Sequence, residues 1–239
     1  EMVSQVNLVQ QQFEIAQGKN IAQLPVRFDG HAIEVRVNAE RVEVQDNGSL
    51  NFVPEPGYVG ELHFPDETHV RVISAVEEGS LVPPYYDSMI AQIICWGSSR
   101  KEACSRMLDY LGKVRLEGIS TNLALSRMIL SDAEFLKGRF DTEFLKGFLE
   151  RIDFNELKSR IEHDSGDSGK GLSQEELLVP ETNEIKVISP QMGGFYLSPS
   201  PEEDPFVREG QVIDIEQPIC LLESMKVFSE INLAHFKSD

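Results

Sequence analysis

The chain has 239 residues, of which 41% are hydrophobic and 26% charged, a composition typical of a globular protein with one large or two modest domains. Its 40 acidic and 22 basic residues give a net charge of -18 without a concentrated basic stripe, which argues against a nucleic-acid partner. No apolar run approaches the roughly 20 residues of a membrane-spanning helix and no signal-peptide pattern opens the chain, so we expect no membrane segment and a cytoplasmic or organelle-matrix location.

Helix and strand patterns alternate through the first part of the chain. Apolar residues at spacings of three and four predict a helix over residues 3–16 that ends at Gly18. Because this helix starts so close to residue 1 and no initiator Met precedes it, we interpret the chain as a piece of a longer protein. Alternating apolar and polar residues predict a half-buried strand over residues 30–38, and we expect further strands at 50–53, 59–64 and 70–75.

A buried strand over residues 93–96 precedes a run of predicted helices. Ser99 opens the first of them, whose apolar stripe extends to Val114 with Gly112 inside it. A second helix follows Asn122, and a capping box over residues 131–134 starts a third. Three cysteines lie in apolar stretches without metal-ligand spacing, and we interpret them as small buried hydrophobic residues: Cys95, Cys104 and Cys220.

The pattern changes after residue 150. Periodicity is lost over residues 151–183, of which 163–171 are polar and rich in Gly and Ser, and this predicts a flexible linker with an r.m.s. span of about 30 Å. A helix over residues 154–161 is the alternative, and it would shorten the linker. Short strands with Pro and Gly return from residue 184, as in a small all-β module. The chain is therefore predicted to consist of a domain at 1–150, a linker at 151–183 and a second domain at 184–239.

A lysine lies between two apolar runs in the second domain. Residues 219–222 and 227–228 read as the arms of a β-hairpin, which places the amine of Lys226 in solvent at the turn. A lysine presented in this way suits covalent loading. An ordinary exposed surface lysine is the alternative that the local pattern leaves open.

The sequence around this lysine resembles the attachment site of biotin carrier (biotinyl) domains. Residues 223–227 (ESMKV) match the pattern Glu-Ala/Ser-Met-Lys-Met except at Val227, and residues 188–196, 198–201 and 207–212 resemble other parts of such a domain in the same order. The resemblance implies covalent biotin on Lys226, attached by a biotin protein ligase. Lipoyl carriers are a rival family, but their lysine normally lies in Asp-Lys-Ala, so Met225 favours biotin. Further strands close a flattened barrel in the family, so we expect residues 184–239 to form an incomplete biotinyl domain.

The first domain resembles the C-terminal part of biotin carboxylase, an ATP-grasp enzyme. The motifs that carry this resemblance are residues 1–9, 30–40 (GHAIEVRVNAE), 83–90 (PPYYDSMI) and 117–122 (EGISTN). It implies an α+β fold of mixed antiparallel sheet and helices, a homodimer formed through this domain, and ATP and Mg as cofactors. In the family most of the ATP and Mg ligands precede the part that corresponds to residue 1.

The resemblance also implies roles for individual residues. Arg71 aligns with the segment where the family places an arginine beside the ureido oxygen of biotin, where a fixed guanidinium stabilises the charge that develops. An ordinary strand arginine that faces solvent is the alternative for Arg71. Residues 85–87 resemble a loop near the dimer interface and biotin pocket, with a buried structural turn as the alternative. Gln92 stands where the family usually has lysine, and residues 141–142 correspond to the adenine edge.

Together these features predict part of a biotin-dependent acyl-CoA carboxylase of fatty acid biosynthesis. It would carboxylate biotin on Lys226 with ATP and bicarbonate, and a carboxyltransferase subunit or domain would pass the carboxyl group to an acyl-CoA. Without the ATP-grasp part, we expect the 239-residue chain alone to be inactive. Two alternatives remain: a non-catalytic fragment that serves only for dimerisation and biotin carriage, and a lipoyl-type carrier.

Overall fold

The computed structural model describes residues 1–20, 22, 27–45, 48–165, 178–180, 185–187, 189–190 and 192–236. The helices are α1 (Leu8–Ala16), α2 (Arg100–Leu111), α3 (Leu123–Ser131), α4 (Ala133–Leu136), α5 (Phe144–Leu149), α6 (Phe154–Ser165) and the 3-10 helix η3 (Leu233–Phe236). The strands are β1 (His31–Asn38), β2 (Glu40–Val44), β3 (Leu50–Pro54), β4 (Gly57–Tyr58), β5 (Leu62–His63), β6 (Val70–Ser74), β7 (Leu81–Val82), β8 (Met89–Gly97), β9 (Arg115–Leu116), β10 (Leu178–Pro180), β11 (Ile185–Val187), β12 (Gly194–Tyr196), β13 (Pro218–Ser224) and β14 (Val227–Asn232). None of the helices in these ranges has the length and apolarity needed to cross a bilayer.

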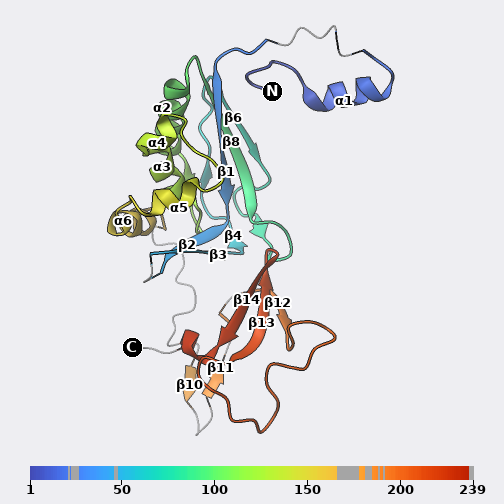
Figure 1. Cartoon of the computed structure of the whole chain (residues 1–239), viewed down its shortest axis with the longest axis vertical. Helices are drawn as coiled ribbons and strands as arrows, with labels where there is room; N and C mark the ends of the chain where they lie inside the picture. Colours follow the sequence, from blue (N-terminus) through green and yellow to red (C-terminus); the bar gives the residue numbers. More distant parts are fainter. Residues whose placement is uncertain are drawn as a thin grey trace.

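A three-stranded antiparallel sheet, in the order β1-β8-β6, is the centre of the first domain. Helices α2 to α6 lie on one side of this sheet, whereas α1 lies apart from them (Figure 1). The predicted alternation in β1 is confirmed, because Ile33, Val35 and Val37 are buried while the residues between them are exposed. Strand β8 begins at Met89, four residues before the predicted start, since it also buries Ile90 against the core. The predicted combination of helices with antiparallel sheet is therefore present.

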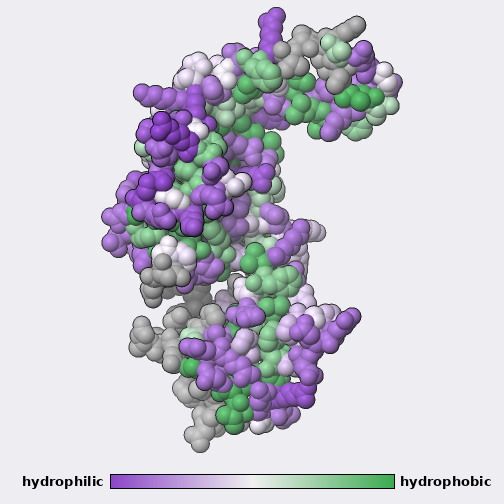
Figure 2. Space-filling view, viewed as in Figure 1, coloured by the Kyte–Doolittle hydropathy of each residue, from purple (hydrophilic) through white to green (hydrophobic). Residues whose placement is uncertain are grey.

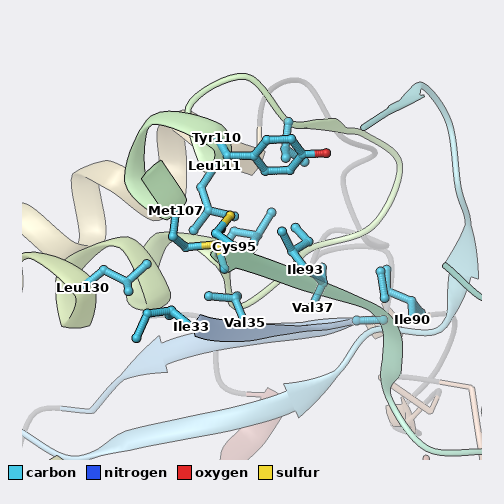
Figure 3. Packing of buried hydrophobic residues seen from close by; sticks show 14 of the residues in the cluster. Ile33, Val35, Val37, Ile90, Ile93, Cys95, Met107, Tyr110, Leu111 and Leu130 are labelled. Atoms are coloured by element: carbon cyan, nitrogen blue, oxygen red, sulfur yellow. Dashed lines mark hydrogen bonds between the residues drawn. The ribbon is translucent and has the colours of Figure 1, made fainter. Parts of the chain in front are cut away.

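The core of this domain lies between β8, β1 and α2 (Figure 3). Met107, Tyr110 and Leu111 on α2 are at most 1% exposed, and Tyr110 donates a hydrogen bond to the carbonyl oxygen of Pro65 at 2.9 Å. Ser99 caps α2 as predicted, since its Oγ accepts from the N–H of Glu102. The helix is shorter than predicted and ends at Leu111, with Gly112 as its C-cap rather than an interior residue.

The capping of α4 differs from the prediction by one residue. The Asp132 carboxylate accepts the N–H groups of Glu134 and Phe135 at 2.9 and 3.0 Å. Ser131 instead belongs to the end of α3, where its hydroxyl donates to the carbonyl oxygen of Arg127 at 2.9 Å. Asp132 directly precedes the first helical residue, which is the position where a carboxylate best satisfies the free N–H groups of a helix.

Part of the predicted linker is a helix that packs on the first domain. Leu157 in α6 is completely buried, and it shares a hydrophobic cluster with Val42, Leu125, Met128 and Phe148. A flexible linker would not bury such a side chain, so residues 154–165 are attached to the first domain. The Gly- and Ser-rich residues 166–177, together with 181–184, lie outside the described residues. The domain limits at 150 and 184 remain a prediction.

Two further predicted elements are shorter than expected. Helix α1 begins at Leu8, where the Asn7 side chain accepts the N–H of Gln10 at 2.9 Å, and it ends near Gly18, which has a φ of 85°. None of its residues is buried, so hydrophobic residues contribute to its surface (Figure 2). The strand expected at residues 59–64 consists only of β5, which pairs with β9, whereas Val59 exchanges backbone hydrogen bonds with Gly79 and Ser80.

The second domain contains the antiparallel sheet β12-β13-β14 and the strand β11, which pairs with β10 from the predicted linker. The predicted hairpin is confirmed, and its arms, β13 and β14, are longer than the apolar runs alone. We call residues 218–232 the lysine hairpin. Cys220, Leu222 and Ile231 are buried in it, with Val187 of β11 packed against them. In Figure 1 its turn lies beside the segment that leads into β8.

Candidate functional site

The turn of the lysine hairpin consists of two residues, Met225 and Lys226. Ser224 and Val227 form the last strand pair on either side of it. Met225 and Lys226 both have positive φ, 49° and 65°, the left-handed backbone that two-residue hairpin turns of the primed type require. Lys226 is exposed, whereas Met225 is 3% exposed. The hairpin therefore presents one amine to solvent on a short backbone segment that is closed by paired strands.

Strand β12 supports the hairpin from one side. A Cβ on Gly193 would lie 2.3 Å from the carbonyl oxygen of Glu223, so only glycine permits this close approach. The Tyr196 hydroxyl donates to the Glu223 carboxylate at 2.5 Å, and this hydrogen bond raises the pKa of Tyr196. These contacts fix β13 immediately before the turn.

The turn also contacts the first domain. The backbone N–H of Met225 donates to the carbonyl oxygen of Pro84 at 2.6 Å, and Met225 belongs to the same buried hydrophobic cluster as β1, β8 and α2. Ser224 is completely buried, and its Oγ has no hydrogen-bond partner among the described residues. Pro84 and Ser224 were predicted only as members of the 83–90 and 223–227 motifs, and the contact between Met225 and Pro84 was not predicted, because it joins segments about 140 residues apart.

Arg71 lies on the sheet face opposite the helices. Its neighbours Val70 and Val72 pack against the core, so Arg71 points the other way. The Arg71 side chain is 56% exposed, and its guanidinium forms an ion pair with the Glu1 carboxylate at 3.6 Å. Arg71 pairs with Ile94 in the middle of the sheet. The described part of the chain thus offers a cation on an open β-sheet face.

A small polar network occupies the same face. Ile94, the partner of Arg71, also pairs with Glu34 of β1, which places Arg71 and Glu34 in one row across the sheet. The Glu34 carboxylate accepts from Gln92 at 3.3 Å and from Arg36 at 3.4 Å. Gln92, where the resembling family usually has lysine, therefore acts here as a neutral donor.

Other residues singled out from the sequence are dispersed. Tyr85 and Tyr86 are 75% and 70% exposed, so the 85–87 turn is not a buried one, and it lies in the loop that contacts Met225. The Asp141 carboxylate accepts the N–H of Glu143 at 2.9 Å, and Thr142 is exposed. The structure therefore brings the 83–88 loop to the lysine hairpin but places Arg71 and Asp141 elsewhere.

The predicted role of the cysteines agrees with their surroundings. All three are free and buried, and burial raises the pKa of Cys95 to about 12. Burial likewise raises the pKa values of Cys104 and Cys220. Over the residues that the structure describes, no group of three or more His, Cys, Asp or Glu side chains could hold a metal ion.

Two protein families match separate parts of the chain. The family described as "Biotin carboxylase C-terminal domain" matches residues 34–147, and the family described as "Biotin-requiring enzyme" matches residues 185–235. The chain contains a biotin carboxylase C-terminal domain followed by a biotin-requiring domain. The first of these contains Arg71, and the second contains the whole lysine hairpin.

Individual relatives agree with this assignment. Biotin carboxylase 1 of Bacillus subtilis (strain 168) is 40% identical over 150 residues, which are 62% of this chain and 32% of the relative. The 2-oxoglutarate carboxylase small subunit of Hydrogenobacter thermophilus is 32% identical over 162 residues, which are 67% of this chain and 33% of the relative. The chain thus spans about a third of the length of the curated relatives it matches, at 32% and 33% of these two.

The fold of the biotin carboxylase C-terminal domain also has solved counterparts. The biotin carboxylase domain dimer of Hydrogenobacter thermophilus 2-oxoglutarate carboxylase, in complex with MgADP, ADP and bicarbonate, matches with a TM-score of 0.54 and 32% identity. The match covers 64% of this chain and 34% of that chain. The biotin carboxylase subunit of pyruvate carboxylase matches with a TM-score of 0.55 and 34% identity, over the same shares of the two chains.

Proposed function

We propose that this chain takes part in the carboxylation of biotin carried covalently on Lys226, as part of a biotin-dependent carboxylase. The observation that supports this most directly is the exposed lysine on a two-residue turn, within a biotin-requiring domain that shares one chain with a biotin carboxylase C-terminal domain. A carrier and the enzyme domain that loads it gain from such a connection, because tethering makes the loading reaction intramolecular.

The residues of this chain would hold and orient the reacting group. The Nζ of Lys226 would form an amide with the carboxyl group of biotin, and the paired strands β13 and β14 would fix the start of the resulting arm. When bound, biotin supplies the ureido nitrogen that carries the carboxyl group. Arg71 would place its charge beside the ureido oxygen and stabilise the negative charge that develops there, as in the family.

ATP and Mg are implied by the family, which places only the adenine edge, at residues 141–142, within this chain. The described residues contain no group of three or more His, Cys, Asp or Glu side chains that could hold a metal ion, and no step is assigned to ATP or Mg on this chain. The nucleotide and metal would be held by a segment that corresponds to the ATP-grasp part of the relatives. The domain would then act as a homodimer with that segment in place.

We also propose which kind of substrate accepts the carboxyl group from biotin. We favour an acyl-CoA, reached through a carboxyltransferase subunit or domain, which would place the protein in fatty acid biosynthesis. The similar proteins named above include parts of pyruvate carboxylase and of 2-oxoglutarate carboxylase, so a 2-oxo acid is the competing acceptor. Assaying the complete carboxylase with acetyl-CoA, propionyl-CoA, pyruvate and 2-oxoglutarate would distinguish the two classes.

The attachment of biotin to Lys226 is the part of the proposal that is simplest to test. The chain is co-expressed with a biotin protein ligase, followed by avidin blotting and mass spectrometry of the peptide that contains Lys226. Biotin is expected on wild type and on the control Lys137→Arg, which changes another exposed lysine, but not on Lys226→Arg. A wild-type chain that stays unmodified would contradict the carrier proposal, and lipoate at Lys226 would establish the lipoyl alternative.

A second assay separates catalysis from carriage alone. Biotin-stimulated ATP hydrolysis is measured for this chain extended at its N-terminus by an ATP-grasp segment, and for its Arg71→Ala variant. Activity that requires Arg71 supports the catalytic proposal. Biotin on Lys226 without any ATP hydrolysis in the extended chain would favour the fragment that serves only for dimerisation and carriage.

A further inference from the structure

Met225 is buried by the other domain rather than by its own hairpin. Turn residues lie on protein surfaces, and its neighbours Lys226 and Val227 are exposed, yet Met225 is only 3% exposed. It belongs to the hydrophobic cluster of the carboxylase domain, while Cys220, Leu222 and Ile231 of the same hairpin form a separate cluster. The methionine beside the attachment lysine is thus an apolar anchor that crosses from one domain to the other.

The receiving surface is the loop of residues 83–88, between β7 and β8. The carboxylase domain holds the C-terminal end of this loop, because the Ser88 hydroxyl donates to the Glu40 carboxylate and the Ser88 carbonyl accepts the N–H of Ala39 at 2.8 Å. The Asp87 carboxylate accepts the N–H of Met89 at 2.9 Å. A loop fixed in this way loses little conformational entropy when the hairpin binds to it.

The contact contains one polar pair that is hydrogen-bonded and one polar group that is not. Pro84 is buried and supplies a carbonyl acceptor, which takes the N–H of Met225 at 2.6 Å. The hydroxyl of Ser224 is buried at the same turn without a partner among the described residues, which weakens the contact. One good hydrogen bond, one apolar anchor and one unpaired hydroxyl are suited to a contact that forms and breaks.

The docked turn lies at a distance from Arg71. The 83–88 loop leads into the start of β8 at Met89, whereas Arg71 pairs with Ile94, five residues further along that strand. At about 3.4 Å per residue, Met89 and Ile94 lie roughly 17 Å apart along β8. The contact therefore fastens the hairpin near one end of the sheet and leaves the surroundings of Arg71 uncovered by it.

We propose that the 83–88 loop is a docking surface for the lysine hairpin, anchored by Met225, at which the carrier rests away from Arg71 between rounds of loading. The docking itself requires no biotin. Its role as a resting position rests on the proposed function, because only a loaded Lys226 has a reason to travel toward Arg71. The biotin-requiring domain would then alternate between this position and the carboxylation site.

Hydrogen exchange on the full chain tests the docking. In Met225→Gln, a polar side chain of similar length replaces the anchor, and we expect the amides of residue 225 and of the 83–88 loop to exchange at least about tenfold faster. A tenfold change corresponds to a loss of about 1.4 kcal/mol, slightly less than the cost expected for losing a fully buried Met side chain. The matched control is Val212→Gln, a change at a 96% exposed residue of the same domain, which should leave these rates unchanged.

Further variants distinguish docking from simple unfolding. The amides of Cys220 and Leu222 should keep their protection in Met225→Gln, which would show that the hairpin itself stays folded. Ser224→Ala removes the unpaired hydroxyl, so the Met225 amide should keep its protection or gain more. Lys226→Arg, which removes the biotin site, should leave that protection unchanged, so a failed biotin assay does not decide the docking. Unchanged exchange in Met225→Gln, or lower protection in Ser224→Ala, would overturn the proposal.

Discussion

The close approach at Gly193 leads to a sharp prediction for the lysine hairpin. In Gly193→Ala the new Cβ would lie 2.3 Å from the carbonyl oxygen and 3.0 Å from the carbonyl carbon of Glu223. Ordinary contact begins at 3.4 Å, so β12 must move away from β13 by roughly 1 Å, and overpacking of this kind costs about 1–3 kcal/mol. The pairing of β12 with β13 is expected to weaken beside the attachment lysine.

Hydrogen exchange measures the weakened pairing of β12 with β13, and the rate of biotin loading measures its consequence for Lys226. The amides of Phe195 and Tyr196 should exchange about tenfold faster or more, since 1.4 kcal/mol corresponds to a factor of ten, and the ligase should load Lys226 more slowly. Gly112→Ala is the control, because Gly112 has a helical backbone and its Cβ would meet nothing closer than 3.4 Å. Unchanged exchange in Gly193→Ala would refute the inference that β12 must move.

Three further predictions concern the carboxylase domain. Asp132→Ala should lower the free energy of unfolding at pH 7 by about 1 kcal/mol. Burial alone would raise the pKa of Asp132, but hydrogen bonds from Phe135, Arg151 and Glu134 outweigh it and lower that pKa. The stabilisation by Asp132 is therefore present above the unfolded pKa of about 3.9 and is lost as the pH falls through the lower folded pKa. Urea titrations of wild type and Asp132→Ala should therefore give the same free energy of unfolding in acid. A difference between the two proteins that grows in acid would contradict this. Leu157→Ala should lower the free energy of unfolding, measured by urea titration, by about 2–5 kcal/mol, because Leu157 is completely buried. Leu8→Ala, at an exposed site, should change it little. Equally small effects of the two substitutions would mean that α6 does not pack on the domain. Cys95, whose pKa burial raises to about 12, should resist iodoacetamide at pH 8 until the chain is unfolded, and rapid labelling of the native protein would contradict its burial.

Local periodicity predicted the elements that pack on the core. The alternation around Val35 and the stripe around Met107 both mark faces that the structure buries. The ends of the elements were harder to predict, because they depend on single hydrogen bonds. Asp132 caps α4 one residue after the predicted Ser131, and Asn7 delays the start of α1.

The candidate site was only partly predictable for a different reason. Lys226 and its turn could be predicted from neighbouring residues, since a two-residue hairpin is a local structure. The packing of Leu157 and the contact between Met225 and Pro84 depend on segments far apart in the chain, and no periodicity records such a pairing. Arg71 was predicted from resemblance, and the structure adds its partner Glu1 and its place on an open face.

The two left-handed residues of the hairpin turn bear on how this protein could be engineered. A turn with positive φ at both positions favours Asn-Gly, whereas Met225 and Lys226 each carry a Cβ that such a backbone accommodates poorly, at roughly 1 kcal/mol or more per residue. A design optimised for stability alone would replace both residues and gain a more rigid hairpin. It would also lose the amine and the anchor, so the turn exemplifies a trade-off in which the less stable sequence is the useful one.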